Sequence, residues 1–222
     1  CAMPEVGIGF FPDVGASHLL PRLPGAYGMF LALTGERVRQ ADALVLGLAE
    51  AAVPSSRMQE LRAALIAGGD VDEILAGFAV PPEPGPLFAE HAVVSTCFNA
   101  CAVTEVLASL DALALEGSVF AAKITSGMRG KSPMSMAIAL EQMKRGAAMN
   151  FAQVMQMEFR IVSRICHGHD FYEGVRAVII DKDNAPRWLP ASLAALDPEA
   201  VAAHFAPLGE QELFLQQLGT ED

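Results

Sequence analysis

The sequence has no long apolar run and is poor in basic residues. No stretch reaches the roughly 18 apolar residues of a transmembrane helix, so no span is expected. Lys and Arg number 15 against 26 Asp and Glu, which gives a net charge of −11. Nucleic acids and anionic membranes attract cationic surfaces, so this charge argues against both as partners. A local basic patch could still hold a small anionic ligand.

Cysteine is also scarce, with four residues in 222. Cys97 and Cys101 are four apart, and Cys166 precedes His167, but no second group completes a zinc site. We therefore expect reduced thiols and no metal or redox cofactor. Residues 1–5 carry no basic segment followed by an apolar one, so no secretory signal is expected and the cytoplasm is the predicted compartment. The absence of an initiator Met suggests a sequence cut from something longer.

Apolar residues are abundant and make up 52% of the chain, enough for a sizeable core. Almost no run alternates with period two, which argues against a β-sandwich or barrel. The first 23 residues are rich in Gly and Pro and predict short extended pieces and turns. The chain after residue 86 predicts helices with strong stop signals. The composition indicates a mostly α protein with residual α/β character at the front.

Local patterns predict most of the elements. Ser132-Pro133 fits an N-cap followed by Pro at the first helical position, and Asn150 fits a second cap. Asp170 to Glu173 has the spacing of a capping box. A short apolar run at 50–54 could be a strand. Helices are expected at 24–34, 40–46, 59–67, 72–78, 133–145, from 151, from 170 to about 179, and at 198–205.

Two carboxylates stand out in the segment MPEVGIGFFPDVG, residues 3–15. Glu5 and Asp13 lie eight residues apart among apolar residues, glycines and prolines. Apolar surroundings raise the pKa of a carboxyl group, and two carboxylates in different environments can divide acid and base roles. Two structural alternatives stay open. Asp13 could cap a helix that begins near Gly15, and Glu5 could be an exposed loop residue.

The same segment resembles the active-site stretch of the crotonase (enoyl-CoA hydratase/isomerase) superfamily. The matching elements are Pro4-Glu5, Gly7, Gly9, PDVG at 12–15 and LPRL at 20–23. Within the superfamily, Asp13 and the segment GHDFYEGVRAVIIDKDNAPRW at 168–188 resemble the 3-hydroxyisobutyryl-CoA hydrolase family. The resemblance runs from about residue 1 to 208. It departs at Ala16 and Ser17, where the family often has glycines.

The resemblance implies an α/β fold. Residues 1–80 would be the last part of a crotonase-like β-β-α spiral core, and residues 87–222 a mostly helical C-terminal region that could build a homo-oligomer. The Pro-rich residues 81–86 would mark the boundary. The implied reaction is hydrolysis of a β-hydroxyacyl-CoA thioester, 3-hydroxyisobutyryl-CoA in valine catabolism. The implied partner is this acyl-CoA substrate, with coenzyme A as part of it and no separate cofactor.

The resemblance also assigns roles to residues. Glu5 would attack the thioester carbonyl or activate a water, and Asp13 would hold the 3-hydroxyl or help place the water. Gly9 and Phe10 would contact the substrate. Lys182 and Arg187, near Trp188, would meet CoA, although a solvated helix end is an alternative for each.

The resemblance leads to two further expectations, on activity and location, and leaves competing interpretations open. The oxyanion hole of the family comes from loops upstream of the Pro-Glu motif, so this chain alone is expected to be inactive. The competing interpretations are an enoyl-CoA hydratase or isomerase on the same scaffold, a non-enzymatic acyl-CoA-binding or interaction module, and a stand-alone helical assembly domain. A eukaryotic source would favour the mitochondrion.

Overall fold

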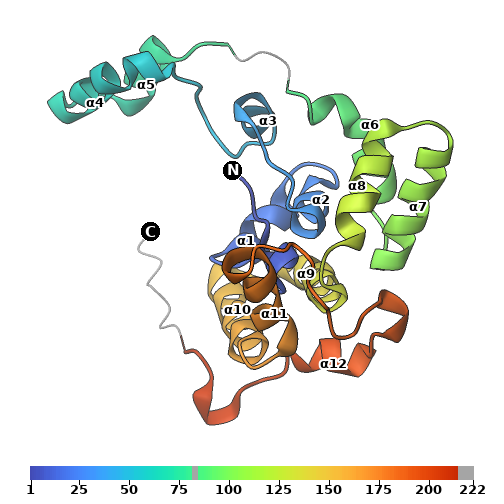
Figure 1. The fold of residues 1–222 in the computed structure, drawn as a ribbon. Coiled ribbons are helices and arrows are strands. Elements are labelled where there is room, and N and C mark those ends of the chain that lie inside the picture. Colours follow the sequence, from blue (N-terminus) through green and yellow to red (C-terminus); the bar gives the residue numbers. More distant parts are fainter. Residues whose placement is uncertain (82–84, 215–222) are drawn as a thin grey trace. The chain divides into compact units, whose positions relative to one another are not determined.

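The computed structural model describes residues 1–81 and 85–214, and every regular element within them is a helix (Figure 1). The chain divides into two compact units. One consists of Cys1 with Val38–Ala92, and the other of Ala2–Arg37 with the chain from Val93 onward. Residues 82–84, at the centre of the expected Pro-rich boundary, lie outside the described residues, so the division into 1–80 and 87–222 stays a prediction.

The first unit is built on three helices. Helices α4 and α5 pack against each other (Figure 1). The Asp70 carboxylate caps α5 by accepting the Glu73 N–H at 3.0 Å. Buried Asp42 of α3 accepts the N–H groups of Leu87 and Phe88 at 3.4 and 3.0 Å, so the segment that follows α5 is tied back to α3. The elements are α3 (Gln40–Val45), η3 (Ser55–Arg57), α4 (Met58–Ala67), α5 (Val71–Phe78) and η4 (Phe88–Glu90).

The strand that the sequence suggested at 50–54 is wrong. This run is not a strand, and one backbone hydrogen bond, from Val80 N to Ala52 O at 2.9 Å, joins it to the segment after α5. A strand needs a ladder of such bonds with a neighbouring strand. Residues 1–81 and 85–214 contain no β-strand, so the α/β character expected at the front of the chain is wrong for these residues.

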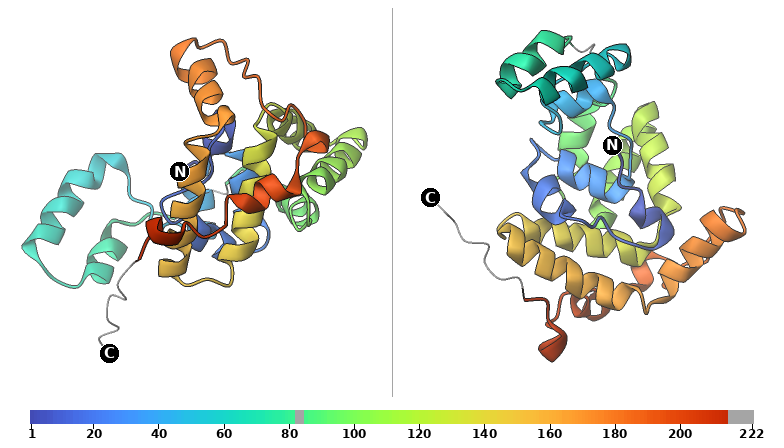
Figure 2. Two further views of the ribbon diagram at one scale, coloured as in Figure 1. Left: turned by 90° about the horizontal axis from the view of Figure 1, so that it is seen from below. Right: turned by 90° about the vertical axis from the view of Figure 1, so that its left-hand side faces the viewer.

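The second unit holds the longer helices. Helices α9 and α10 run side by side, and α7 packs along α8 (Figure 2). Helix α6 (His91–Cys97) leads from the first unit into the second. The remaining helices are α1 (Ala16–Leu19), α2 (Tyr27–Thr34), α7 (Val103–Leu115), α8 (Val119–Arg129), α9 (Pro133–Gly146), α10 (Phe151–Ile165), α11 (His169–Val175) and α12 (Pro198–Ala203). Shorter turns are the 3-10 helices η1 (Glu5–Ile8), η2 (Leu20–Arg22), η6 (Leu193–Ala195) and η7 (Gly209–Gln211) and the π-helix η5 (Arg176–Ile180).

One hydrophobic cluster joins the front segment to α9 and α10. Phe11, three residues after the end of η1, has no exposed surface and packs with side chains of both helices. Burying six such side chains supplies a large apolar contribution at the base of the front segment. The cluster consists of Phe11, Ile138, Met157, Ile161, Ile165 and Phe205.

The predicted caps of α9 and α10 are confirmed. Ser132 Oγ accepts the Ser135 N–H at 3.0 Å, and Pro133 is the first helical residue. Asn150 and Gln153 form a reciprocal capping box at the start of α10. The cap predicted at Asp170 is wrong, because α11 begins at His169 with Gly168 as N-cap. None of the described helices has the length and apolar character that a membrane span requires.

Candidate active site

Glu5 opens η1 in a half-buried position. The turn forms because the Gly7 N–H donates to Pro4 O at 2.8 Å and Gly9 ends it with a left-handed φ of 71°. The carboxylate oxygen Oε2 of Glu5 is buried and has no hydrogen-bond partner among the described residues. Burial raises the pKa of Glu5, a hydrogen bond with its own backbone opposes this, and the charge of Asp13 adds to the rise. The alternative of an exposed loop residue is therefore wrong.

Two glycines allow η1 and α11 to pack backbone against backbone. A Cβ on Gly9 would lie 2.1 Å from Asp170 O, and a Cβ on Gly174 would lie 2.3 Å from Ile8 C and O. Real Cβ atoms essentially never approach this closely, so neither position accepts a larger residue without movement. The Pro-Glu segment and the segment at 168–188, far apart in sequence, thus meet backbone to backbone.

A buried carboxylate network fixes this contact. Asp170 Oδ2 accepts from Ser132 Oγ at 2.5 Å, and Oδ1 accepts the Leu189 N–H at 2.7 Å. His169 Nδ1 lies 3.1 Å from the same Oδ1. The Ser132 N–H in turn donates to Val6 O at 3.3 Å. Asp170 therefore links the starts of α9 and α11 to η1, which carries Glu5.

Asp13 precedes a strained turn. Val14 has a φ of 51° and Gly15 a φ of 88°, and the Ala16 N–H donates to Asp13 O at 3.0 Å. The side chain of Asp13 is half-buried and makes no hydrogen bond or ion pair with any described residue. The alternative that Asp13 caps α1 is therefore wrong. A carboxylate from α10, Glu158, occupies that place by accepting the N–H groups of Gly15 at 2.8 Å and Ser17 at 3.0 Å.

The two predicted substrate residues, Gly9 and Phe10, follow Glu5 closely in the chain. Gly9 lines a cavity of about 110 Å³ together with Phe171 and Asp170. Phe10 packs between Phe11 and Phe171, with ring centroids 4.8 and 5.2 Å apart. Packing of this kind fixes the backbone that joins the two carboxylates. A contact of Gly9 or Phe10 with substrate stays a prediction.

The predicted CoA residues sit on a loop organised by Arg176. Glu173 accepts the Arg187 N–H at 2.8 Å as well as hydrogen bonds from the Arg176 guanidinium, and Arg176 lowers the pKa of Glu173 to about 2. Lys182 has a left-handed φ of 56°, and both Lys182 and Arg187 are exposed. Two cations thus project from a braced loop, and CoA binding by them stays a prediction. The Arg176 guanidinium donates to three carboxylates, Glu173 at 2.9 and 3.0 Å and Asp181 and Asp183 at 2.7 Å each.

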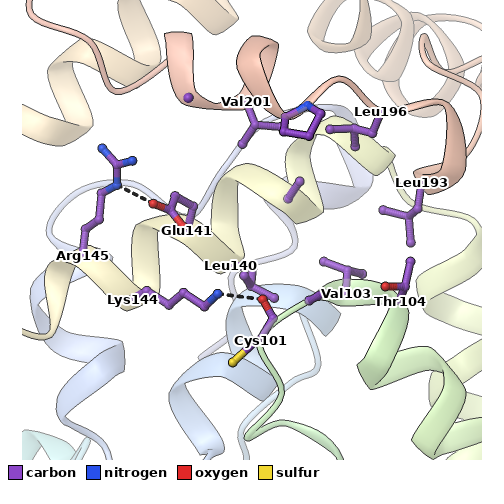
Figure 3. A pocket seen from close by; sticks show the side chains of 14 residues that line it. Cys101, Val103, Thr104, Leu140, Glu141, Lys144, Arg145, Leu193, Leu196 and Val201 are labelled. Carbon is purple, nitrogen blue, oxygen red and sulfur yellow. Dashed lines mark hydrogen bonds and ion pairs between the residues drawn. The ribbon is translucent and has the colours of Figure 1, made fainter.

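A separate pocket of about 430 Å³ lies between α9, α12 and the start of α7 (Figure 3). Its cations are already engaged, because Lys144 donates to Cys101 O at 2.6 Å and Arg145 to Glu141 Oε1 at 2.7 Å. None of the site residues predicted from the sequence lines it. Its apolar lining includes Val103, Leu140, Leu193, Leu196 and Val201.

Cys166, His167 and His169 do not form a metal centre. Over residues 1–81 and 85–214, no group of three His, Cys, Asp or Glu side chains is arranged to hold an ion. All four cysteines are free, with Cys97 buried and Cys101 exposed in a turn beyond the end of α6. The helix α6 ends at Cys97, so Cys97 and Cys101 do not lie on one helix.

Sequence reasoning missed the buried polar residues that hold the site. Glu158 occupies a position of α10 at which apolar side chains recur, between buried Val154 and Ile161. Gln142 is likewise fully buried on α9, and its Nε2 donates to Pro12 O and Ser17 Oγ. A polar residue in a core-facing position of an amphipathic helix was the available signal, since such groups need buried partners.

Lys131 was missed as well. Its Nζ lies 3.7 Å from where a Cβ on Gly7 would stand, and burial lowers its pKa while the charge of Glu36 opposes that change. A partly desolvated cation therefore faces the middle of η1.

Comparison with known proteins gives one family and several relatives. Residues 1–205 match the family described as Enoyl-CoA hydratase/isomerase. A mitochondrial 3-hydroxyisobutyryl-CoA hydrolase from Gallus gallus is 39% identical over 224 residues, covering 96% of this chain and 57% of that protein.

Two solved structures are similar to the chain. A carnitinyl-CoA dehydratase from Mycobacterium thermoresistibile has a TM-score of 0.88 at 36% identity, covering 96% of this chain and 60% of that one. An enoyl-CoA hydratase from Rhodobacter sphaeroides 2.4.1 has a TM-score of 0.85 at 36% identity, covering 96% and 61%. The chain thus spans less than two thirds of each of these proteins.

Proposed function

The chain belongs to the enoyl-CoA hydratase/isomerase family, and from this premise we propose that the protein hydrolyses a β-hydroxyacyl-CoA thioester, 3-hydroxyisobutyryl-CoA in particular. One observation carries the proposal. Among the described residues, Glu5 has a buried, unpartnered carboxylate oxygen close enough to Asp13 for the charges to interact, and the Asp13 side chain makes no hydrogen bond or ion pair there. The curated relative from Gallus gallus, named a 3-hydroxyisobutyryl-CoA hydrolase, supports the choice of substrate.

Glu5 is the proposed acid–base or nucleophilic group. Its raised pKa makes the ionised carboxylate a stronger proton acceptor than an exposed glutamate. As a general base it takes a proton from water while the water oxygen bonds to the thioester carbon. The carbon–sulfur bond then breaks, and the CoA thiolate leaves and takes a proton. As a nucleophile, Glu5 would bond to the acyl carbon while the carbon–sulfur bond breaks and the CoA thiolate leaves, and water would hydrolyse the resulting anhydride in a second step.

Asp13 is the proposed specificity group. Its unengaged carboxylate can accept a hydrogen bond from a 3-hydroxyl group of the acyl chain. A site built for such a bond discriminates strongly, because a substrate without the hydroxyl leaves the carboxylate unpaired. We predict that Asp13→Ala lowers the preference for 3-hydroxyisobutyryl-CoA over isobutyryl-CoA at least tenfold. An equal loss of kcat/KM on both thioesters would remove this role.

The experiment that tests the reaction is thiol release from 3-hydroxyisobutyryl-CoA by the full-length product of the gene. The proposal predicts stoichiometric release of CoA and of the free hydroxy acid. A catalytically competent protein that releases no thiol would contradict it. Hydrolysis by the 222-residue chain alone would contradict the expectation that this segment is inactive without upstream residues.

Hydration of an enoyl-CoA is the second candidate. The two solved structures at TM-scores of 0.88 and 0.85 bear the names of a dehydratase and a hydratase, which favours this reaction. The enoyl chromophore distinguishes the two reactions, because hydration removes its absorbance without freeing a thiol. Loss of absorbance without thiol release would favour the hydratase. The unengaged Asp13 side chain supports the hydrolase.

The remaining proposals concern the whole protein. Lys182 and Arg187 are proposed to meet the phosphates of CoA, because both are exposed on a loop that Arg176 braces. A β-β-α spiral core, an assembly of several copies and the cytoplasmic or mitochondrial location also remain proposals. The name of the Gallus gallus relative supports the mitochondrion for a eukaryotic source.

A further inference from the structure

We infer that Glu158 and Gln142 are positioning residues that hold Asp13 in place for the reaction. The inference rests on the proposed function, in which Asp13 contacts the substrate. Both side chains are buried, and both act on the turn from Pro12 to Ser17. They reach it from two different helices, α10 and α9.

Glu158 is a charged residue at a buried position of α10, where burial of a carboxylate costs free energy. Val154 and Ile161 beside it are fully buried, and an apolar residue there would avoid burying a carboxylate. Glu158 is satisfied by the N–H groups of Gly15 and Ser17, from a position more than 140 residues away in the chain. A buried carboxylate with two amide donors indicates that a defined turn geometry is being held.

The turn needs to be held because its backbone is strained. Val14 is a β-branched residue with a φ of 51°, in a region that such residues rarely adopt, and its side chain is 81% exposed. No packing of its own side chain therefore compensates for the strain. Such conformations persist where surrounding bonds over-determine them, and they cluster at active sites. Here the bonds to Glu158 fix the residue directly after Val14.

Gln142 fixes the two ends of the same turn. Its Nε2 donates to Pro12 O, on the residue before Asp13, and to Ser17 Oγ at 2.6 Å. Gly146, one helical turn further along α9, lets the turn approach, because a Cβ there would stand 2.1 Å from Ser17 O. Asp13 thus lies between backbone groups tied to α9 on one side and to α10 on the other.

The consequence for function is geometric. A catalytic or binding group displaced by about 1 Å can cost a factor of about 10² in rate. Glu158 and Gln142 would act through the placement of Asp13, without touching substrate. Loss of either bond set should therefore affect the hydroxylated substrate more than the plain one.

The test is Glu158→Gln in the full-length protein. The amide keeps the shape of the side chain, but only its oxygen can accept, and its NH₂ group faces the second N–H donor. We expect kcat on 3-hydroxyisobutyryl-CoA to fall at least tenfold, with KM and turnover of isobutyryl-CoA changed by less than threefold. Glu141→Gln, on the surface of α9 beside Arg145, is the matched control and should leave both rates unchanged.

A double variant identifies the route of action. In an Asp13→Ala background, Glu158→Gln should cause no further loss of substrate discrimination, because the group it positions is gone. A loss that is equal on both thioesters, or that adds fully to that of Asp13→Ala, would overturn the inference and leave Glu158 a structural residue.

Hydrogen exchange separates failure of the inference from failure of the proposed function. The amides of Gly15 and Ser17 should exchange at least tenfold faster in Glu158→Gln than in Glu141→Gln. Should the protein release no thiol from either substrate, the proposed function fails, and faster exchange at these two amides would still support the positioning. Unchanged exchange would overturn it whatever the activity.

Discussion

Replacing Gly174 by Ala tests whether the site depends on the close contact between η1 and α11. The new Cβ would stand 2.3 Å from Ile8 C and O and 2.6 Å from Ile8 Cα, whereas ordinary contacts begin near 3.4 Å. The obstructing atoms are backbone, so no side chain can swing away. The 3-10 helix that begins with Glu5 must therefore move by about 1 Å, or α11 must do so.

Two magnitudes follow from this displacement. Overpacking of this kind costs about 1–3 kcal/mol of unfolding free energy. A shift of about 1 Å in the segment that carries Glu5 lowers kcat by a factor of about 10². We expect both effects in Gly174→Ala, with KM changed less than kcat.

The assay combines urea denaturation with thiol release, both on the full-length protein. Gly127→Ala is the matched control, because Gly127 lies within α8 and no atom stands within 4 Å of its added Cβ apart from its chain neighbours and the backbone of its own helix. The control should stabilise the protein by about 0.4–1 kcal/mol and leave turnover unchanged. The same chemical change thus has opposite expected signs at the two positions.

If the unfolding free energy of Gly174→Ala were as high as that of Gly127→Ala, the close contact between η1 and α11 would be refuted. Lost stability with unchanged kcat would keep the contact but show that the placement of η1 on α11 does not matter for the reaction.

Three other predictions use the polar groups of the site. Because burial raises the pKa of Glu5 in the folded protein, the protonated side chain contributes stability below about pH 4.5 that is lost as pH rises and the buried carboxyl ionises. Glu5→Gln cannot ionise, so it should raise Tm more at about pH 8 than at about pH 4. Because Arg176 lowers the pKa of Glu173 to about 2, the interaction between the two side chains stabilises the folded protein above about pH 4.5, and this stabilisation fades toward pH 2. Arg176→Ala should therefore lower Tm more at about pH 7 than at about pH 3. Ser132→Ala removes the cap of α9 and a bond to buried Asp170, and should cost about 2–4 kcal/mol in urea denaturation.

Local signals in the sequence predicted local structure well. Ser132 and Asn150 were identified as caps from residue type and spacing alone, because the groups they bond lie three residues ahead. The helices expected at 24–34 and 40–46 are followed by Gly35 and Gly47, and both glycines lie just beyond observed helices with left-handed φ values of 61° and 71°. Information of this kind is contained within one turn of chain.

Predictions failed where the bonding partners are distant in sequence. Asp170 has cap spacing, but its partners Leu189 and Ser132 lie 19 and 38 residues away. The apolar run at 50–54 could not become a strand without neighbouring strands, which the described residues do not contain. Propensity alone cannot supply such long-range partners.

The candidate site shows the same division. Glu5 and Asp13 were singled out from their residue types and the resemblance, and the structure adds that Glu5 is partly buried and that Asp13 is not a cap. Glu158 and Gln142 were not found, because the groups they hold lie 125 to 143 residues away. Contacts over that separation exist only in the folded chain.

The most direct test of the central claim is the rate of thiol release from 3-hydroxyisobutyryl-CoA by the full-length protein and its Glu5→Gln variant. The amide keeps the size of the side chain but can neither accept a proton nor attack the thioester. We predict rapid release by the wild type and a loss of at least about 10³-fold in the variant, as expected when an essential acid–base group is removed. Equal release by the two proteins would contradict the assignment of the chemistry to Glu5.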